Sequence, residues 1–164
     1  TSYAQADSLW RISPEARCER VEPRGPSSIL GLRRGTRGSA VGDVDGDGRP
    51  DLLISAIDEA AILGMNRFGP DNARICVRLL GPVAQTAGAP RTPRDGTGAR
   101  CVLVVGEGAA EHALLAETFT AAGYQSASSP WLHFGLGDAK TYSSLQISWP
   151  SGATEELPGG PVAG

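Results

Sequence analysis

The stretch Asp43-Val44-Asp45-Gly46-Asp47-Gly48-Arg49-Pro50-Asp51 holds four carboxylates in one alternating phase of a glycine-containing segment. Aspartates this close repel one another unless a cation lies among them, and Ca²⁺ takes about six to eight oxygen ligands. The pattern therefore predicts a calcium-binding loop. Its expected ligands are the side chains of Asp43, Asp45, Asp47 and Asp51 and the backbone carbonyl of Arg49. The alternative is a solvated acidic turn, but four acids in this phase with the glycine rarely arise in a plain turn.

The loop opens like an EF-hand and closes differently. Gly48 stands where an EF-hand makes its sharp turn, but Ile54 occupies the position at which an EF-hand has its bidentate glutamate. Ile54 ends the apolar run 52–54, and Pro50 argues against a helix entering there. We therefore expect a buried β-strand directly after the acidic loop.

Residues 39–54, Ser-Ala-Val-Gly-Asp-Val-Asp-Gly-Asp-Gly-Arg-Pro-Asp-Leu-Leu-Ile, resemble an FG-GAP/VCBS repeat. This calcium-loop hairpin is used in integrin-type β-propellers and in many secreted bacterial proteins. A propeller needs several blades of four strands each. The motif occurs once in this sequence, with no second copy at a repeat period. We therefore expect a single repeat and no propeller.

The second half of the sequence resembles an ASPIC/UnbV domain. Five blocks carry the resemblance in the right order: residues 72–81, 94–105, 123–126, 132–138 and 145–152. In that family the domain usually follows FG-GAP repeats in secreted or cell-envelope proteins, which is the order here. The resemblance implies a shortened member of the family that lacks most of the propeller, and it supplies no catalytic residues to carry over.

Alternating apolar and polar residues predict strands in the second half of the chain. The apolar positions are Ile75, Val77 and Leu79, then Leu132 and Phe134, then Leu145, Ile147 and Trp149. Hairpin turns are expected at residues 135–138 and 150–152. Residues 111–120 fit one face of a helix, but the family resemblance implies a strand, which we follow. These strands predict an all-β fold, a small antiparallel β-sandwich or open barrel.

The chain is expected to divide into four parts. Residues 1–38 are predicted to form an irregular arm with a helical turn starting at Ser13, and residues 39–66 the calcium-loop segment, with a short helix at 60–63. Residues 67–158 are predicted to form the β domain and residues 159–164 a tail. The length of 164 residues, with 22 glycines and 12 prolines, suits short strands and many turns.

Charge and hydropathy bear on two questions: which classes of partner the protein binds, and in which compartment it works. The net charge is −3 and the pI about 5.4, and no basic stripe points to nucleic acid or an anionic membrane. No apolar stretch is long enough to span a bilayer, and the start shows no signal-peptide pattern. Weak calcium loops fill at about 10⁻⁴–10⁻³ M, as outside cells. We expect a periplasmic or extracellular location, with attachment to the cell surface left open.

The three cysteines leave alternatives open. Cys76 and Cys101 lie in the predicted strands 74–80 and 100–105, which would become cross-strand neighbours if the two strands paired. A disulfide between them and two small buried thiols are equally compatible with the sequence. Cys18 is left over, as a free thiol or as a partner for another cysteine.

Catalysis is not expected. The two histidines, His112 and His133, have no nucleophile and orienting acid at recognisable spacings, and no hydrolase elbow or phosphate-binding loop is present. We predict a non-catalytic accessory subunit that docks a protein partner in an exported or envelope assembly. The alternative is a glycan-binding module in which Trp131, His133 and Tyr142 form a platform, with Trp10 as a further exposed ring.

Overall fold

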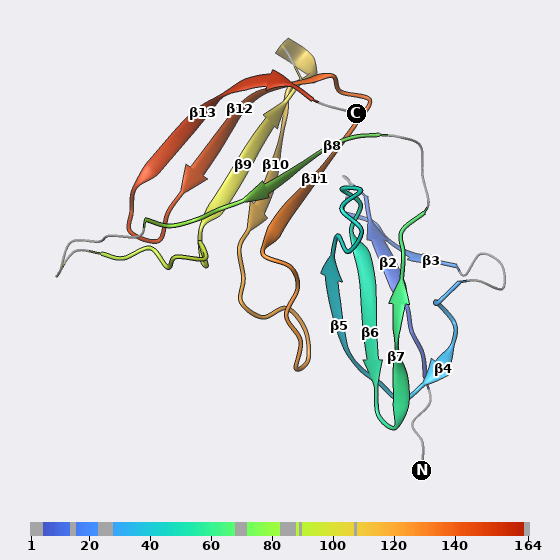
Figure 1. Ribbon diagram of the computed structural model, residues 1–164. Coiled ribbons are helices and arrows are strands. Elements are labelled where there is room, and N and C mark those ends of the chain that lie inside the picture. Colours follow the sequence, from blue (N-terminus) through green and yellow to red (C-terminus); the bar gives the residue numbers. More distant parts are fainter. Residues whose placement is uncertain are drawn as a thin grey trace.

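Alternating apolar side chains build a β-sandwich in the second half of the chain. Figure 1 shows the computed structural model, which describes residues 5–13, 16–22, 28–67, 72–82, 88, 90–106 and 108–162. One sheet has the order β10-β9-β12-β13, and a two-stranded sheet pairs β11 with β8. The bounds are β8 Ala73–Arg78, β9 Arg100–Val105, β10 His112–Glu117, β11 Trp131–Gly137, β12 Thr141–Ser148 and β13 Thr154–Pro161. All these pairings are antiparallel, as predicted for a sandwich, and no closed barrel forms from these strands.

The core of the sandwich is centred on β9 and includes the apolar positions predicted in β11 and β12. Cys101, Leu103 and Val105 of β9 are fully buried, and the residues between them are not. The predicted apolar positions of β11 and β12 also point inward, and Trp149 packs against their cluster. The predicted strand in residues 111–120 is confirmed as β10, which follows the short 3₁₀-helix η1 Gly108–Ala110.

The first half of the described chain forms smaller sheets. The antiparallel order β5-β6-β7 is built from β5 Thr36–Gly42, β6 Asp51–Ala56 and β7 Glu59–Gly64. Two short pairs accompany it: β1 Gln5–Ala6 with β4 Arg33–Arg34, and β2 Leu9–Ile12 with β3 Cys18–Val21. The expected buried strand after the acidic loop is β6, in which Ile54 is 5% exposed.

Three local predictions in the described chain are wrong. The expected helix at 60–63 is part of β7, because its residues pair with β6, as Ile62 does with Ile54. The expected irregular arm contains strands, and an ion pair between Arg11 and Glu19 joins β2 to β3. The helical turn expected from Ser13 falls partly on residues 14 and 15, which lie outside the described residues, and its expected end belongs to β3. The turn at 135–138 makes no hairpin, since β11 pairs with β8 and β12 with β9. The hairpin at 150–152 is confirmed between β12 and β13.

The pairing of the strands that hold Cys76 and Cys101 also differs from the prediction. β8 pairs with β11 and β9 with β10 and β12, so the strands of Cys76 and Cys101 are not neighbours in one sheet. Cys18, Cys76 and Cys101 are all free thiols. The premise for a Cys76–Cys101 disulfide is therefore wrong, and the buried-thiol alternative describes Cys101.

A loop of the sandwich covers the open edge of the small sheet. The backbone N–H of Ser129 donates to the carbonyl of Val41 (2.7 Å), and the N–H of Val41 donates to Ser128 Oγ (3.1 Å). Gly38 is buried here, and a Cβ on it would lie 2.9 Å from the carbonyl oxygen of Tyr124. These contacts satisfy backbone groups that an edge strand otherwise exposes.

Among the described residues, no helix has the length and apolar character needed to cross a bilayer.

Candidate metal centre

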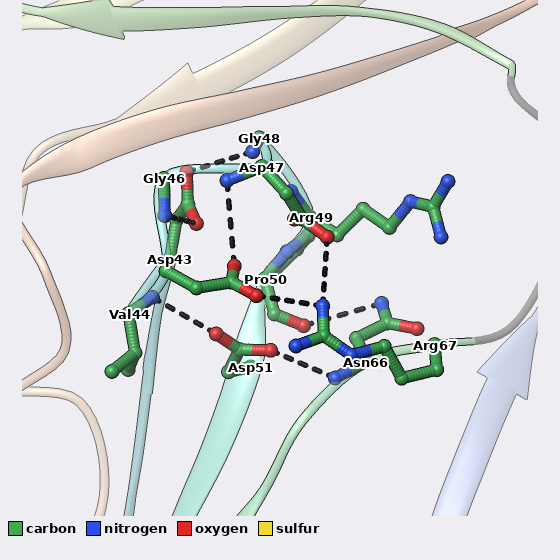
Figure 2. A network of polar contacts seen from close by, with 11 residues as sticks. Asp43, Val44, Gly46, Asp47, Gly48, Arg49, Pro50, Asp51, Asn66 and Arg67 are labelled. Atoms are coloured by element: carbon green, nitrogen blue, oxygen red, sulfur yellow. Dashed lines mark hydrogen bonds and ion pairs between the residues drawn. The ribbon is translucent and has the colours of Figure 1, made fainter.

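The acidic run forms the loop between β5 and β6 (Figure 2). Two glycines shape it: Gly46 has φ = 75° and Gly48 has φ = 81°, values in the left-handed region that glycine adopts without steric cost. The second also allows close approach, because a Cβ on Gly48 would lie 2.5 Å from Nε of Arg74. The local sequence therefore folds back on itself and presses its turn against β8.

Asp43 and Asp51 are fixed by backbone donors. The two carboxylate oxygens of Asp43 accept hydrogen bonds from the N–H groups of Gly46 and Gly48, both 2.8 Å long. Those of Asp51 accept from Val44 (2.9 Å) and Asn66 (2.7 Å), and Asp51 is only 2% exposed. Asp51 thus ties the start of the loop to the segment that follows β7.

Asp45 and Asp47 instead contact a basic side chain. Nη1 of Arg67 lies 2.6 Å from Oδ2 of Asp45 and 3.2 Å from Oδ2 of Asp47. The hydrogen bond from Arg67 is the main cause that lowers the pKa of the Asp45 carboxyl below its ordinary value. Asp47 also accepts a hydrogen bond from the backbone N–H of Arg49 through Oδ1 (2.8 Å).

Three of the four acids converge. One carboxylate oxygen each from Asp43, Asp45 and Asp51 lie within 4.8 Å of one another. Since ligand oxygens lie about 2.3–2.6 Å from Ca²⁺, two ligands of one ion can be at most about 5 Å apart. The oxygens therefore fit a shared ion, and an all-oxygen set suits Ca²⁺ rather than a thiophilic metal. Asp47 lies outside this cluster of described residues, and a role for the carbonyl of Arg49 stays a prediction.

The back of the loop meets the sandwich at β8 and β11. Sγ of Cys76 lies 3.8 Å from the carbonyl oxygen of Gly48 and 3.2 Å from Nδ1 of His133. Burial, and then the charge of Asp43, raise the pKa of the Cys76 thiol. A pocket borders this contact and is lined in part by Asn66, Arg74 and His133. Sequence reasoning missed the Cys76–His133 pair, because it depends on the pairing of β8 with β11.

Of the expected aromatic platform, Trp131 and His133 share strand β11 and Tyr142 lies apart from them. Trp131 is 44% exposed, with the guanidinium of Arg78 6.0 Å from its ring centre. His133 lies on the same strand as Trp131 and is half-buried against Cys76 of β8. Tyr142 lies on β12, in the other sheet, and packs against the core. His112 is exposed, and Trp10 is 58% exposed on β2.

Comparison with known families matches the two segments that the sequence patterns single out. Residues 35–59 match the FG-GAP repeat, which spans β5, the acidic loop and β6. Residues 89–163 match the family described as ASPIC and UnbV, which includes every strand of the four-stranded sheet. No curated protein and no solved structure matches the chain significantly.

Proposed function

Because the chain combines an FG-GAP repeat with an ASPIC/UnbV domain, we propose that it is a calcium-stabilised, non-catalytic docking subunit of an exported or cell-envelope assembly. Both domains are typical of extracellular or envelope interaction modules. The observation that carries the proposal is the convergence of oxygens from Asp43, Asp45 and Asp51 on the loop of the FG-GAP repeat. Location outside the cytoplasm follows from the calcium concentrations at which weak loops of this kind fill.

In this proposal the ion is held by the converging acids, with Asp47 and the carbonyl of Arg49 completing the set. Binding would neutralise the repulsion among four carboxylates and hold β5 and β6 together at one end. Because the unfolded chain offers no such arrangement, the free energy of binding adds to the free energy of folding. The ion is thus structural rather than catalytic.

The distribution of buried residues supports this dependence on a metal. Of the buried hydrophobic residues in the described part of the chain, all but Ile54 belong to the sandwich, from Ala73 onward. The described part of the first half therefore buries little apolar surface of its own, although such burial is the main driving force of folding. A bound ion and contacts with other surfaces would supply what its core lacks.

An exposed apolar surface on the small sheet supports the docking role. Leu53 of β6 and Leu63 of β7 are direct cross-strand partners, and they are 44% and 45% exposed. Paired leucines on one open face of a sheet form an apolar patch of the kind that marks protein contacts. We assign the protein partner to this face.

The docking role predicts that charge on this face abolishes partner binding. The immobilised chain is expected to retain an envelope protein from a solubilised cell-envelope extract in calcium, and to lose it when Leu53 and Leu63 are both replaced by lysine. Both positions are exposed, so the double variant should keep its circular dichroism spectrum and melting temperature. Leu157→Lys is the control, because Leu157 of β13 is about as exposed as Leu53 and Leu63. Equal retention by the wild type and the double variant would contradict the assignment.

A glycan-binding module is the second candidate, because Trp131 is exposed and carries Arg78 beside its ring. Tyr142 does not join it on the same sheet, so the expected platform reduces to Trp131 and the neighbouring His133. Stacking on sugars is stronger with several rings. Retention on immobilised glycans that Trp131→Ala removes would favour this candidate over docking.

The absence of catalysis is supported by the state of the Cys76 thiol. Its distance of 3.2 Å from Nδ1 of His133 resembles a nucleophile and its base. However, a reactive cysteine needs a lowered pKa because the thiolate is the nucleophile. Burial raises the pKa of the Cys76 thiol instead. The pair is therefore proposed to be a packing contact between the loop and the sandwich.

A further inference from the structure

One nitrogen of Arg67 bridges two carboxylates of the acidic loop. Nη1 lies 2.6 Å from Asp45 and 3.2 Å from Asp47. Figure 2 shows Arg67 beside the acidic loop. Arg67 reaches this position because the N–H of the preceding residue, Asn66, donates to the buried carboxylate of Asp51. The same buried acid that belongs to the oxygen cluster therefore places a positive charge against the loop.

We propose that Arg67 is a built-in counter-ion that competes with calcium for Asp45 and Asp47 and thereby sets the affinity of the loop. This inference rests on the proposed calcium binding and adds the residue that regulates it. In the absence of the ion, the guanidinium neutralises part of the carboxylate repulsion. When the ion binds, the guanidinium gives up the two carboxylates and turns to solvent.

The contacts divide the four acids into two kinds. Asp43 and Asp51 are held by neutral backbone N–H groups, which orient the carboxylates and leave their negative charge uncompensated. Asp45 and Asp47 are held by a cation that takes Oδ2 of each. Oδ1 of Asp47 also accepts a hydrogen bond from the backbone N–H of Arg49.

Arg67, Asp45 and Asp47 are exposed enough for a metal ion to replace the guanidinium. The side chain of Arg67 is 58% exposed, and those of Asp45 and Asp47 are each 30% exposed. Ion pairs in such positions contribute little stability because water and salt screen them. A divalent ion coordinated by several oxygens at short range can displace a single guanidinium. The competition should lower calcium affinity without preventing binding.

Replacing Arg67 by glutamine tests the competition. Calorimetric titration of CaCl₂ into the whole chain at low ionic strength is expected to show about fivefold tighter binding for Arg67→Gln than for the wild type. Arg91→Gln is the matched control, since it removes the same charge from an exposed position of the sandwich. It should leave the affinity within about twofold of the wild type. The advantage of Arg67→Gln should shrink as salt is added, because salt screens the pair in the wild type.

The outcomes separate the inference from the function on which it rests. If the wild type and Arg67→Gln both fail to bind calcium, the proposed calcium site fails and the inference falls with it. If the wild type binds and Arg67→Gln binds equally or more weakly, calcium binding stands and the competition is overturned. An equal gain in Arg91→Gln would also overturn it, because the effect would then come from net charge alone. Thermal melts give a second readout, in which calcium should raise the melting temperature of Arg67→Gln more than that of the wild type.

Discussion

Asp51→Ala is expected to lower the free energy of unfolding by about 2–5 kcal/mol even without calcium. Asp51 is 2% exposed, and its two oxygens accept the N–H groups of Val44 and Asn66. Alanine removes the acceptor of both hydrogen bonds, which are partly buried, at a cost of about 1–3 kcal/mol for each donor left unsatisfied. The loop would lose its link to the segment after β7 and, with it, a proposed calcium ligand.

Urea unfolding in chelator measures this structural part alone. Asp51→Asn keeps one oxygen acceptor, so its free energy of unfolding should lie between those of the wild type and Asp51→Ala. Asp138→Ala is the control, because Asp138 is an exposed acid that follows β11. A loss in Asp51→Ala no larger than that in Asp138→Ala would show that Asp51 does not brace the loop. Repeating the titrations in calcium should widen the difference for Asp51→Ala and leave the control unchanged.

Leu103→Ala is expected to cost about 3–5 kcal/mol of unfolding free energy, since it leaves a cavity in a well-packed core. Leu103 is fully buried at the centre of β9, between β10 and β12 in the four-stranded sheet. Calcium affinity at temperatures where the variant stays folded should be unchanged. The core of the sandwich and the acidic loop belong to different sheets, so the cavity removes no proposed ligand.

Leu115→Ala is the matched control for Leu103→Ala. Leu115 lies on the neighbouring strand β10 and is 59% exposed, so its truncation should cost well under 1 kcal/mol. Denaturant unfolding followed by tryptophan fluorescence measures both variants. Similar losses in the two variants would mean that the apolar faces of this sheet are wrongly assigned.

The sequence predicted what depends on local chemistry. The alternating aspartates and glycines predicted the loop, and the apolar run after Pro50 predicted β6. Alternation also identified the inward faces of β11 and β12, because a buried sheet face repeats every second residue. These features depend on residues that are close in the chain, so a single sequence displays them.

Features that depend on long-range pairing were not predicted. Residues 59–64 contain alanines that suit a helix, but pairing with β6 makes them a strand, since tertiary context overrides weak propensity. Cys76 faces His133 across 57 residues, and the two meet only because β8 pairs with β11. Arg67 lies near the acids because β7 returns the chain to the loop. No spacing rule in the sequence indicates these contacts.

Calcium stabilisation of the fold is tested most directly by thermal melts of the whole chain in calcium and in chelator, with light scattering to confirm a constant size. At a calcium concentration about 100 times the dissociation constant, binding should add about 2.7 kcal/mol of stability. For a protein of this length that predicts a rise in melting temperature of about 5–10 °C. Asp45→Ala, which removes an exposed member of the oxygen cluster, should abolish most of the rise. Identical melting of the wild type in calcium and in chelator would contradict the account.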